Sequence, residues 1–368
     1  MIERFRRIPF FLAVLCLLLI PTLASAQATI KVNDNINFKF GTLIQTWADS
    51  AEIAADPQGY ANNLFVRRIR FLVGGQISPT ISFFYETDNP NLGKAPKALG
   101  SGFITQDAFI EWKPLGATNN SFILDAGLML PPLCRNCLES AATLLSLDYG
   151  SFSFTESAAT QSSVGRDTGV LAKGYFSGGH FEYRAGIFQG FRRTGSRNAF
   201  RGTGRLQYNF WDTEAGYTYP GVYLGNKKIL SVGAGADHQN DYRAWSADVF
   251  LSLPNPAKNA LNGELTVLRF DGGTGFFPAT TPIPEQDDYT AQIGYYLSGP
   301  KVMPWFRYEH QDFKAAASDP NDNSRWQGGL TWYPNGHNFN VKGAYSHITP
   351  RVGNSTNQYT VQLQFFYY

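Results

Sequence analysis

The sequence predicts an all-β protein, a transmembrane antiparallel β-barrel of about sixteen strands with one loop folded into its interior. Segment after segment alternates apolar with polar residues, which is the period of a strand whose two faces meet different surroundings. Aromatic residues make up 15% of the chain, yet its mean hydropathy is negative. This combination is typical of a barrel wall that faces lipid on the outside and water on the inside.

The first 26 residues have the features of a secretory signal peptide. A basic start with Arg4, Arg6 and Arg7 precedes an apolar run over 10–20, and small residues at 24–26 form a cleavage site. The apolar run is too short to span a membrane as a helix, and no later segment has 18 apolar residues in a row. The sequence therefore predicts a leader over 1–26 and a mature barrel over 27–368.

The C-terminal segment 358–368, QYTVQLQFFYY, shows the alternation clearly. Val361, Leu363 and Phe365 fall on one face of an extended chain, and Gln362 and Gln364 fall on the other. Taken alone, this segment also suits the closing strand of a soluble β-sandwich. The same pattern recurs along the chain, for example over 62–77, 180–189, 201–210 and 288–297, and this favours the barrel.

The connections indicate the strand number. Tight turns at 78–79, 176–179, 298–301 and 334–336 contrast with long polar stretches at 49–61, 88–102, 271–285, 314–323 and 349–357. In an outer-membrane barrel the short turns share the periplasmic rim and the long loops share the extracellular rim. This holds for sixteen strands if 211–227 is one long periplasmic connection rather than a strand. Fourteen and eighteen strands stay open.

Residues 131–165 interrupt the strand pattern. The segment is too long for a turn, and 138–147 has helical character. A barrel of this size encloses an aqueous channel unless something fills it. We therefore expect the 131–165 loop to fold inward and narrow the pore, and an exposed surface loop is the alternative.

Charge and cysteine usage limit the partners. The leader holds three of the 31 basic and one of the 29 acidic residues, so the mature chain carries 28 of each, which does not suggest a nucleic-acid partner. Cys134 and Cys137 are the only mature cysteines, and their CxxC spacing in an oxidising compartment predicts a local disulfide. No histidine is close to them in sequence, so we expect no metal site and no cofactor.

Basic residues on the polar face of the predicted strands are the candidate pore lining. An arginine is charged at any physiological pH, and rings of Arg or Lys favour anions. Acidic residues such as Glu111, Asp125 and Glu309 fall on the same face, so salt bridges within the lumen are the alternative role for these cations. The candidates are Lys39, Arg68, Arg70, Arg135, Arg166, Arg184, Arg201, Arg205, Arg307 and Arg325.

Four segments resemble the phosphate-selective porin O and P family of Gram-negative outer membranes. They are LFVRRIRFLVGGQI (64–77), LDAGLMLPP (124–132), YLGNKKILSVGAGADHQ (223–239) and WYPNGHNFNVKGAY (332–345). The resemblance implies a sixteen-stranded barrel that forms a homotrimer, lumen arginines, an inward third extracellular loop and diffusion of small anions. Family members named for phosphate carry lysine-rich linings, whereas 131–165 here has no Lys and only Arg135. General or weakly anion-preferring conduction is therefore the expectation.

The predicted function is passive diffusion of small hydrophilic solutes, anionic or polar, across the outer membrane in which the barrel contacts lipid. A general non-selective porin is the first alternative. A barrel enzyme and an adhesin with partner-binding loops are the others. The sequence contains no GxSxG, HExxH or Walker lysine motif, so we assign no catalytic residue.

Overall fold

The computed structural model describes residues 28–53, 56–96, 99, 102–162, 164–192, 199–273, 276–278, 281–314 and 322–368. The predicted leader over 1–26 lies outside these residues. None of the described helices is long and apolar enough to cross a membrane. The elements are β1 (Ala28–Lys31), β2 (Asn37–Ile53), β3 (Asp56–Ser78), β4 (Ile81–Asp88), β5 (Ile104–Trp112), β6 (Ile123–Met129), η2 (Asn136–Leu138), β7 (Asp167–Phe176), η3 (Ser177–Gly179), β8 (Phe181–Phe188), β9 (Arg201–Asn209), β10 (Ile229–Gln239), β11 (Tyr242–Pro254), β12 (Ala260–Asp271), β13 (Gln286–Tyr296), β14 (Val302–Phe313), β15 (Asn323–Asn335), β16 (Phe339–Pro350) and β17 (Thr356–Tyr367).

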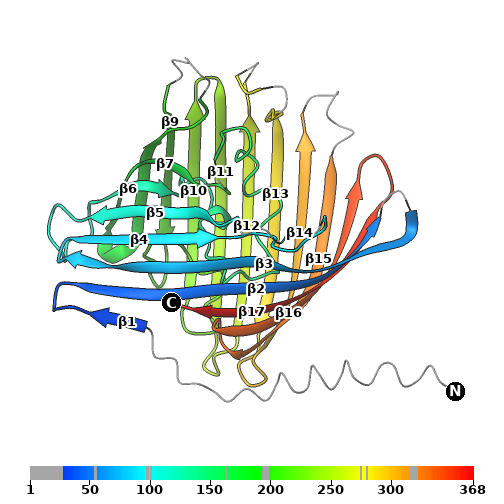
Figure 1. Ribbon diagram of the computed structural model, residues 1–368, viewed down its shortest axis with the longest axis horizontal. Helices are drawn as coiled ribbons and strands as arrows, with labels where there is room; N and C mark the ends of the chain where they lie inside the picture. Colours follow the sequence, from blue (N-terminus) through cyan, green and yellow to red (C-terminus); the bar gives the residue numbers. More distant parts are fainter. Residues whose placement is uncertain are drawn as a thin grey trace.

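Strands β2 to β17 form a closed antiparallel barrel of 16 strands (Figure 1), which confirms the predicted fold class. Each strand pairs with the next one along the chain, and β17 closes the barrel by pairing with β2 from Tyr367↔Thr42 to Gln358↔Ala51. Closure gives each of the strands β2 to β17 two neighbours, and the long strand β3 extends beyond β4, which pairs with it from Leu72 to Ser78.

The short strand β1 is an addition that the sequence pattern did not predict. It pairs with the beginning of β2, from Ala28↔Phe40 to Lys31↔Asn37. Strand β17 pairs with β2 only from Thr42 onward. Strand β1 therefore covers the end of the β2 edge that the C-terminal strand does not reach.

The wall has the polarity that the alternation predicted. Val361 on β17 is 52% exposed on the outside, whereas its neighbour Gln362 is 0% exposed on the inside. The same holds around the barrel, where Ile187 on β8 and Leu265 on β12 are exposed while charged side chains are buried. An apolar exterior around a polar interior is the reverse of a soluble fold and suits a lipid environment.

The two rims differ. We call the rim where β2 begins and β17 ends the terminal rim. It carries connections of two to five residues, except for residues 113–122 between β5 and β6 and residues 210–228 between β9 and β10, which we call the rim connection. The opposite rim carries the longer loops, among them residues 130–166 between β6 and β7, which we call the lumen loop. The long connections at 211–227 and 131–165 thus lie between the strands where the sequence placed them.

Two local predictions were wrong. The polar stretch 49–61 is no loop, because β2 and β3 stay paired as far as Ile53↔Asp56. The 138–147 segment forms no α-helix, and the lumen loop contains only the single 3-10 turn η2. In both places contacts made by the surrounding barrel outweigh local propensity.

Candidate functional site: two cavities beside a filled half of the lumen

The lumen loop lies inside the barrel. We call the part of the lumen that it occupies together with the rim connection the filled half. Its buried residues include Leu130, Leu133, Leu138, Leu145 and Leu147. The amide of Gln45 on β2 and the ammonium of Lys342 on β16 both donate hydrogen bonds to carbonyl groups of this loop. The loop is therefore held by wall strands, as an inward-folded segment must be.

The rim connection enters the lumen from the other end and pairs with the lumen loop. The Tyr219 N–H donates to the Leu138 carbonyl at 2.9 Å, and the Ser140 N–H donates to the Tyr219 carbonyl at 2.9 Å. The two segments run parallel at the bridge between Glu139 and Tyr219. The sequence predicted a connection here but not its inward course.

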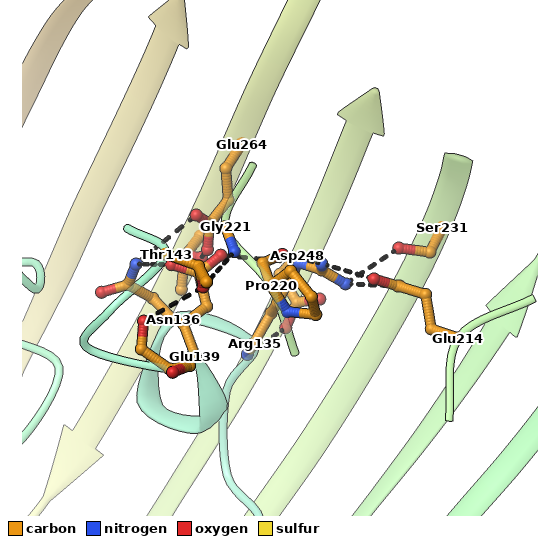
Figure 2. Close-up of polar contacts among 12 residues, drawn as sticks. Arg135, Asn136, Glu139, Thr143, Glu214, Pro220, Gly221, Ser231, Asp248 and Glu264 are labelled. Carbon is orange, nitrogen blue, oxygen red and sulfur yellow. Dashed lines mark hydrogen bonds and ion pairs between the residues drawn. The ribbon is translucent and has the colours of Figure 1, made fainter. Parts of the chain in front are cut away.

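Arg135 joins the two segments by its side chain (Figure 2). Its guanidinium donates to both carboxylate oxygens of Glu214 at 2.7 and 2.8 Å and to the Pro220 carbonyl at 3.1 Å. It also stacks against the Phe250 ring, 3.6 Å from the centroid. The Gly221 N–H donates to the Thr143 hydroxyl at 3.2 Å as a further link. A bidentate pair of this kind fixes orientation as well as distance.

The pKa values of two carboxylates near this junction are shifted in opposite directions. Burial disfavours the charged form of Glu214, but Arg135 outweighs burial and lowers its pKa. Burial raises the pKa of Glu139 well above its usual range, and the neighbouring carboxylate of Glu264 adds to the effect. Asn136 donates to both Glu139 and Glu264, at 3.1 and 3.4 Å.

Three further candidate arginines lie in this filled half, each beside a carboxylate. Arg184 donates to Glu182 at 2.6 Å, and Arg205 donates to Asp248 at 2.5 and 2.7 Å. Arg201 pairs with Asp237 at 2.5 Å. Arg184 also donates to the carbonyl groups of Gly216 and Tyr217 in the rim connection. These arginines and Arg135 stabilise the filling and line neither of the cavities described below.

The two mature cysteines lie in the lumen loop close to η2. A disulfide joins Cys134 to Cys137, whose Cα atoms are 5.1 Å apart. Both residues pack in a buried cluster with Phe191, Phe277 and other apolar side chains. Among the described residues, no group of three or more His, Cys, Asp or Glu side chains has the arrangement of a metal site.

A cavity of about 380 Å³, which we call the vestibule, lies between the lumen loop and the walls of β3, β14 and β15. Its lining is strongly cationic, because a single carboxylate, that of Asp148, stands among five cations. The cations are Arg67, Arg68, Lys94, Arg307 and Arg325. Three of them are candidates from the sequence, and Arg67 and Lys94 are not.

A β-bulge explains why the sequence pattern missed Arg67. Gln45 of β2 pairs with Arg68, and Thr46 pairs with Val66, so Arg67 is an extra residue in β3. Both arginines consequently reach Asp148, at 3.0 Å from Arg67 and 2.5 Å from Arg68. In a regular strand they would point to opposite faces. The bulge also turns Phe65 inward, where it is buried, although the alternation placed it outside.

The charges in the vestibule are not balanced. Burial disfavours the charged form of Asp148, but Arg67 and Arg68 outweigh it and hold its pKa well below the usual range. Arg325 donates only long hydrogen bonds of 3.4 Å, to Ser151, Ser346 and Gln358. Within the part of the chain that the structure describes, Arg325 forms no ion pair, and its Nε donates to no partner. No carboxylate among the described residues therefore neutralises this guanidinium directly.

A second cavity of about 640 Å³, the inner cavity, lies along the inner faces of β2 to β5. Its cations Lys39, Arg70 and Arg166 are all candidates from the sequence. Its carboxylates are Glu86, Asp107, Glu111 and Glu139. Arg70 pairs with Glu86 at 2.6 Å and Arg166 pairs with Asp107 at 3.2 Å. This cavity is close to balanced in charge, unlike the vestibule.

The C-terminus lies at the terminal-rim end of the inner cavity. Phe366 and Tyr368 line it, in phase with the inward residues of β17. The Tyr368 ring packs over Gly41 and Gly74, where a side chain would collide with it. Figure 1 shows the chain end beside β2.

Solved structures of outer-membrane porins share this fold at low sequence identity. An anion-selective porin from Comamonas acidovorans is 13% identical with a TM-score of 0.61, covering 90% of this chain and 99% of its own. OmpF of Salmonella typhi in complex with daunomycin is 14% identical with a TM-score of 0.61, covering 92% and 100%. OprB of Pseudomonas putida is 8% identical with a TM-score of 0.61, covering 90% and 94%. No protein-family model and no curated protein matches the sequence. The chain therefore has the fold of outer-membrane porins.

Proposed function

We propose that this protein is a porin of the Gram-negative outer membrane, through which small hydrophilic solutes diffuse passively and which catalyses no reaction. The closed barrel, the apolar exterior and the two polar cavities support the proposal. Residues 1–26 act as the secretory leader, and lipid surrounds the apolar wall.

We further propose a preference for small anions. The observation that carries this proposal is the vestibule, where five cations and one carboxylate line the cavity. A cluster of fixed positive charge attracts anions and repels cations. The anion-selective porin among the structural neighbours is in keeping with such a preference. The sequence resemblance adds phosphate to the solutes to be tested, and it adds a homotrimer as the assembly.

A general porin with little ion preference is the second candidate, and the inner cavity favours it. There the three cations face four carboxylates and most are paired. If the inner cavity rather than the vestibule determines which ions pass, the pore will discriminate weakly between anions and cations.

Single-channel recording in a planar bilayer tests these proposals. We expect discrete conductance steps and, under a KCl gradient, a reversal potential of the sign that chloride selectivity gives. Phosphate added to one side should reduce the chloride current if it occupies the vestibule. A reversal potential near zero would favour the general porin. Absence of any conductance would contradict the proposed channel function and leave the enzyme and the adhesin as the alternatives.

A further inference from the structure

One aromatic side chain separates the two cavities. Of the described residues that line the vestibule and those that line the inner cavity, Tyr149 alone belongs to both sets. It is a residue of the lumen loop, and its ring therefore lies where a solute would leave one cavity for the other.

The Tyr149 ring is held firmly in this position. Its hydroxyl donates to the Glu139 carbonyl at 2.7 Å, and its N–H donates to the Asp148 carboxylate at 2.8 Å. Its carbonyl accepts a hydrogen bond from Arg307 at 3.0 Å. The ring meets Phe154 edge-on, with centroids 5.1 Å apart. The hydrogen bond of the hydroxyl and the contact with Phe154 hold the ring, and the two backbone hydrogen bonds hold the chain that carries it.

Positive charge lies on both sides of the ring. The Arg68 guanidinium, which lines the vestibule, is 5.4 Å from the ring centroid. Arg70 and Arg166 line the inner cavity, and their charges act on the Tyr149 hydroxyl. An anion that leaves Arg68 thus finds the next cations directly beyond the ring.

The described part of the lumen where the rim connection meets the lumen loop is tightly packed. Across the lumen loop from these cavities, Arg135, Glu214 and Tyr219 are at most 2% exposed and join the rim connection to the lumen loop. Pro220 and Tyr217 of the same connection form part of the inner-cavity lining. The rim connection therefore forms one side of the inner cavity.

We propose that solutes pass from the vestibule, beside β3, β14 and β15, into the inner cavity along β2 to β5, and that the Tyr149 ring is the narrowest point of this path. Small anions pass from Arg68 to Arg70 and Arg166 across the edge of this ring, so Tyr149 sets the size limit. The inference rests on the proposed porin function and deepens it by naming the path and the residue that restricts it.

Three variants test the role of the ring. Tyr149→Ala joins the two cavities, and we expect single-channel conductance to rise roughly twofold or more because the limiting cross-section widens. Tyr149→Phe keeps the ring and removes only the hydrogen bond to Glu139, so its conductance stays close to that of the wild type. Tyr223→Ala is the matched control, because it removes the same side chain from the rim connection at a place that lines neither cavity.

A cysteine variant gives a second test if Tyr149→Ala does not fold. Tyr149→Cys places a lone thiol on the path, since Cys134 and Cys137 are joined in a disulfide. A bulky methanethiosulfonate reagent should then reduce the current stepwise and leave the wild type unaffected.

The outcomes distinguish failure of the role proposed for Tyr149 from failure of the proposed porin function. A conducting wild type with Tyr149→Ala no different from Tyr223→Ala, or a Tyr149→Cys channel indifferent to the reagent, would overturn the role of Tyr149 and leave the porin standing. If neither the wild type nor any variant conducts ions, the porin proposal is overturned as well. A closed wild type opened by Tyr149→Ala would support both.

Discussion

At the scale of single residues, an arginine inside this barrel has one of two surroundings. Arg201 in the filled half is fully buried and pairs with Asp237 at 2.5 Å. Arg325 in the vestibule is only half-buried, and its hydrogen bonds are all 3.4 Å long. A fully buried guanidinium needs a carboxylate to offset its lost hydration, whereas one beside water does not. By this criterion Arg201 belongs to the filling and Arg325 can act on a solute, whereas Arg68, Arg70 and Arg166 line the cavities and are paired with carboxylates as well.

Arg325→Gln should therefore weaken anion preference without unfolding the barrel. Removing a charge that no carboxylate balances lowers the positive potential of the vestibule, and we expect the chloride-to-potassium permeability ratio to fall roughly twofold. Reversal potentials under a KCl gradient measure this permeability ratio. Arg243→Gln is the control, because it removes the same charge from an exposed position on β11. Equal effects of the two variants would show that overall charge, and not the vestibule, determines selectivity.

Alternation in the sequence places most lumen residues but fails at irregular backbone. Arg68 and Arg70 were predicted to face inward and do so, because β3 is regular between them. Arg67 was missed because a bulge adds one residue to the strand, and no pattern in RRIR marks that insertion. Asp148, its partner, lies in a loop where alternation says nothing.

At the scale of elements, the rim connection is the segment that sequence reasoning left incomplete. Strand parity placed 211–227 between two strands on the terminal rim, but its inward course depends on pairing with the lumen loop far away in sequence. Its composition carried a signal, since three tyrosines and Val222 are more apolar surface than an exposed turn needs. Tyr219 and Val222 are in fact 1% exposed.

The Arg135–Glu214 pair should dominate the attachment of this element. Removing one partner leaves a buried charge unbalanced, so Glu214→Gln and Arg135→Gln should each lower the free energy of unfolding by about 3 to 5 kcal/mol. The double variant removes both charges of this pair and should lose less than the sum of the single losses. Urea titration in detergent micelles, followed by tryptophan fluorescence, measures the free energy of unfolding of the wild type, the two single variants and the double variant.

Arg269→Gln provides a reference for that cycle. Arg269 pairs with Asp287 at 3.0 Å near the opposite rim, where solvent screens the pair. An exposed pair of this kind contributes at most about 1 kcal/mol. Strict additivity of the Arg135 and Glu214 losses would mean that the two side chains act independently and that the backbone pairing alone holds the rim connection.

At the scale of the whole molecule, the barrel was predictable and its filling was not. Repeated alternation and rim parity favoured sixteen strands over fourteen and eighteen, because every strand of a closed wall obeys the same two-sided constraint. The interior obeys no such repeat. The lumen loop was expected inside because a barrel of this size encloses an aqueous channel unless something fills it, and because the segment is too long for a turn. Which residues it meets there, such as Glu214 or Lys342, depends on three-dimensional contacts that periodicity does not encode.

The arrangement of the cavities makes a prediction about the molecule as a conductor. The vestibule, the Tyr149 ring and the inner cavity lie one after another, so their electrical resistances add and the narrowest dominates. Shortening the rim connection widens only the inner cavity. The hairpin continues from β9 and β10 as far as the hydrogen bond between the Asp212 N–H and the Lys228 carbonyl. Residues 213–227 can therefore be replaced by an Asn-Gly turn, with Arg135→Gln added so that no guanidinium loses its carboxylate.

In the wild-type background this shortened variant should conduct only slightly better, because the Tyr149 ring still limits the current. In the Tyr149→Ala background the same shortening should add a larger increment, since the inner cavity then contributes more of the total resistance. The two changes together should thus exceed the sum of their separate effects on conductance. Single-channel recordings of the wild type, the shortened variant, Tyr149→Ala and the combined variant measure these increments in conductance. Increments that simply add would mean that the rim connection blocks a second, parallel path, and the path past Tyr149 would then be one of two.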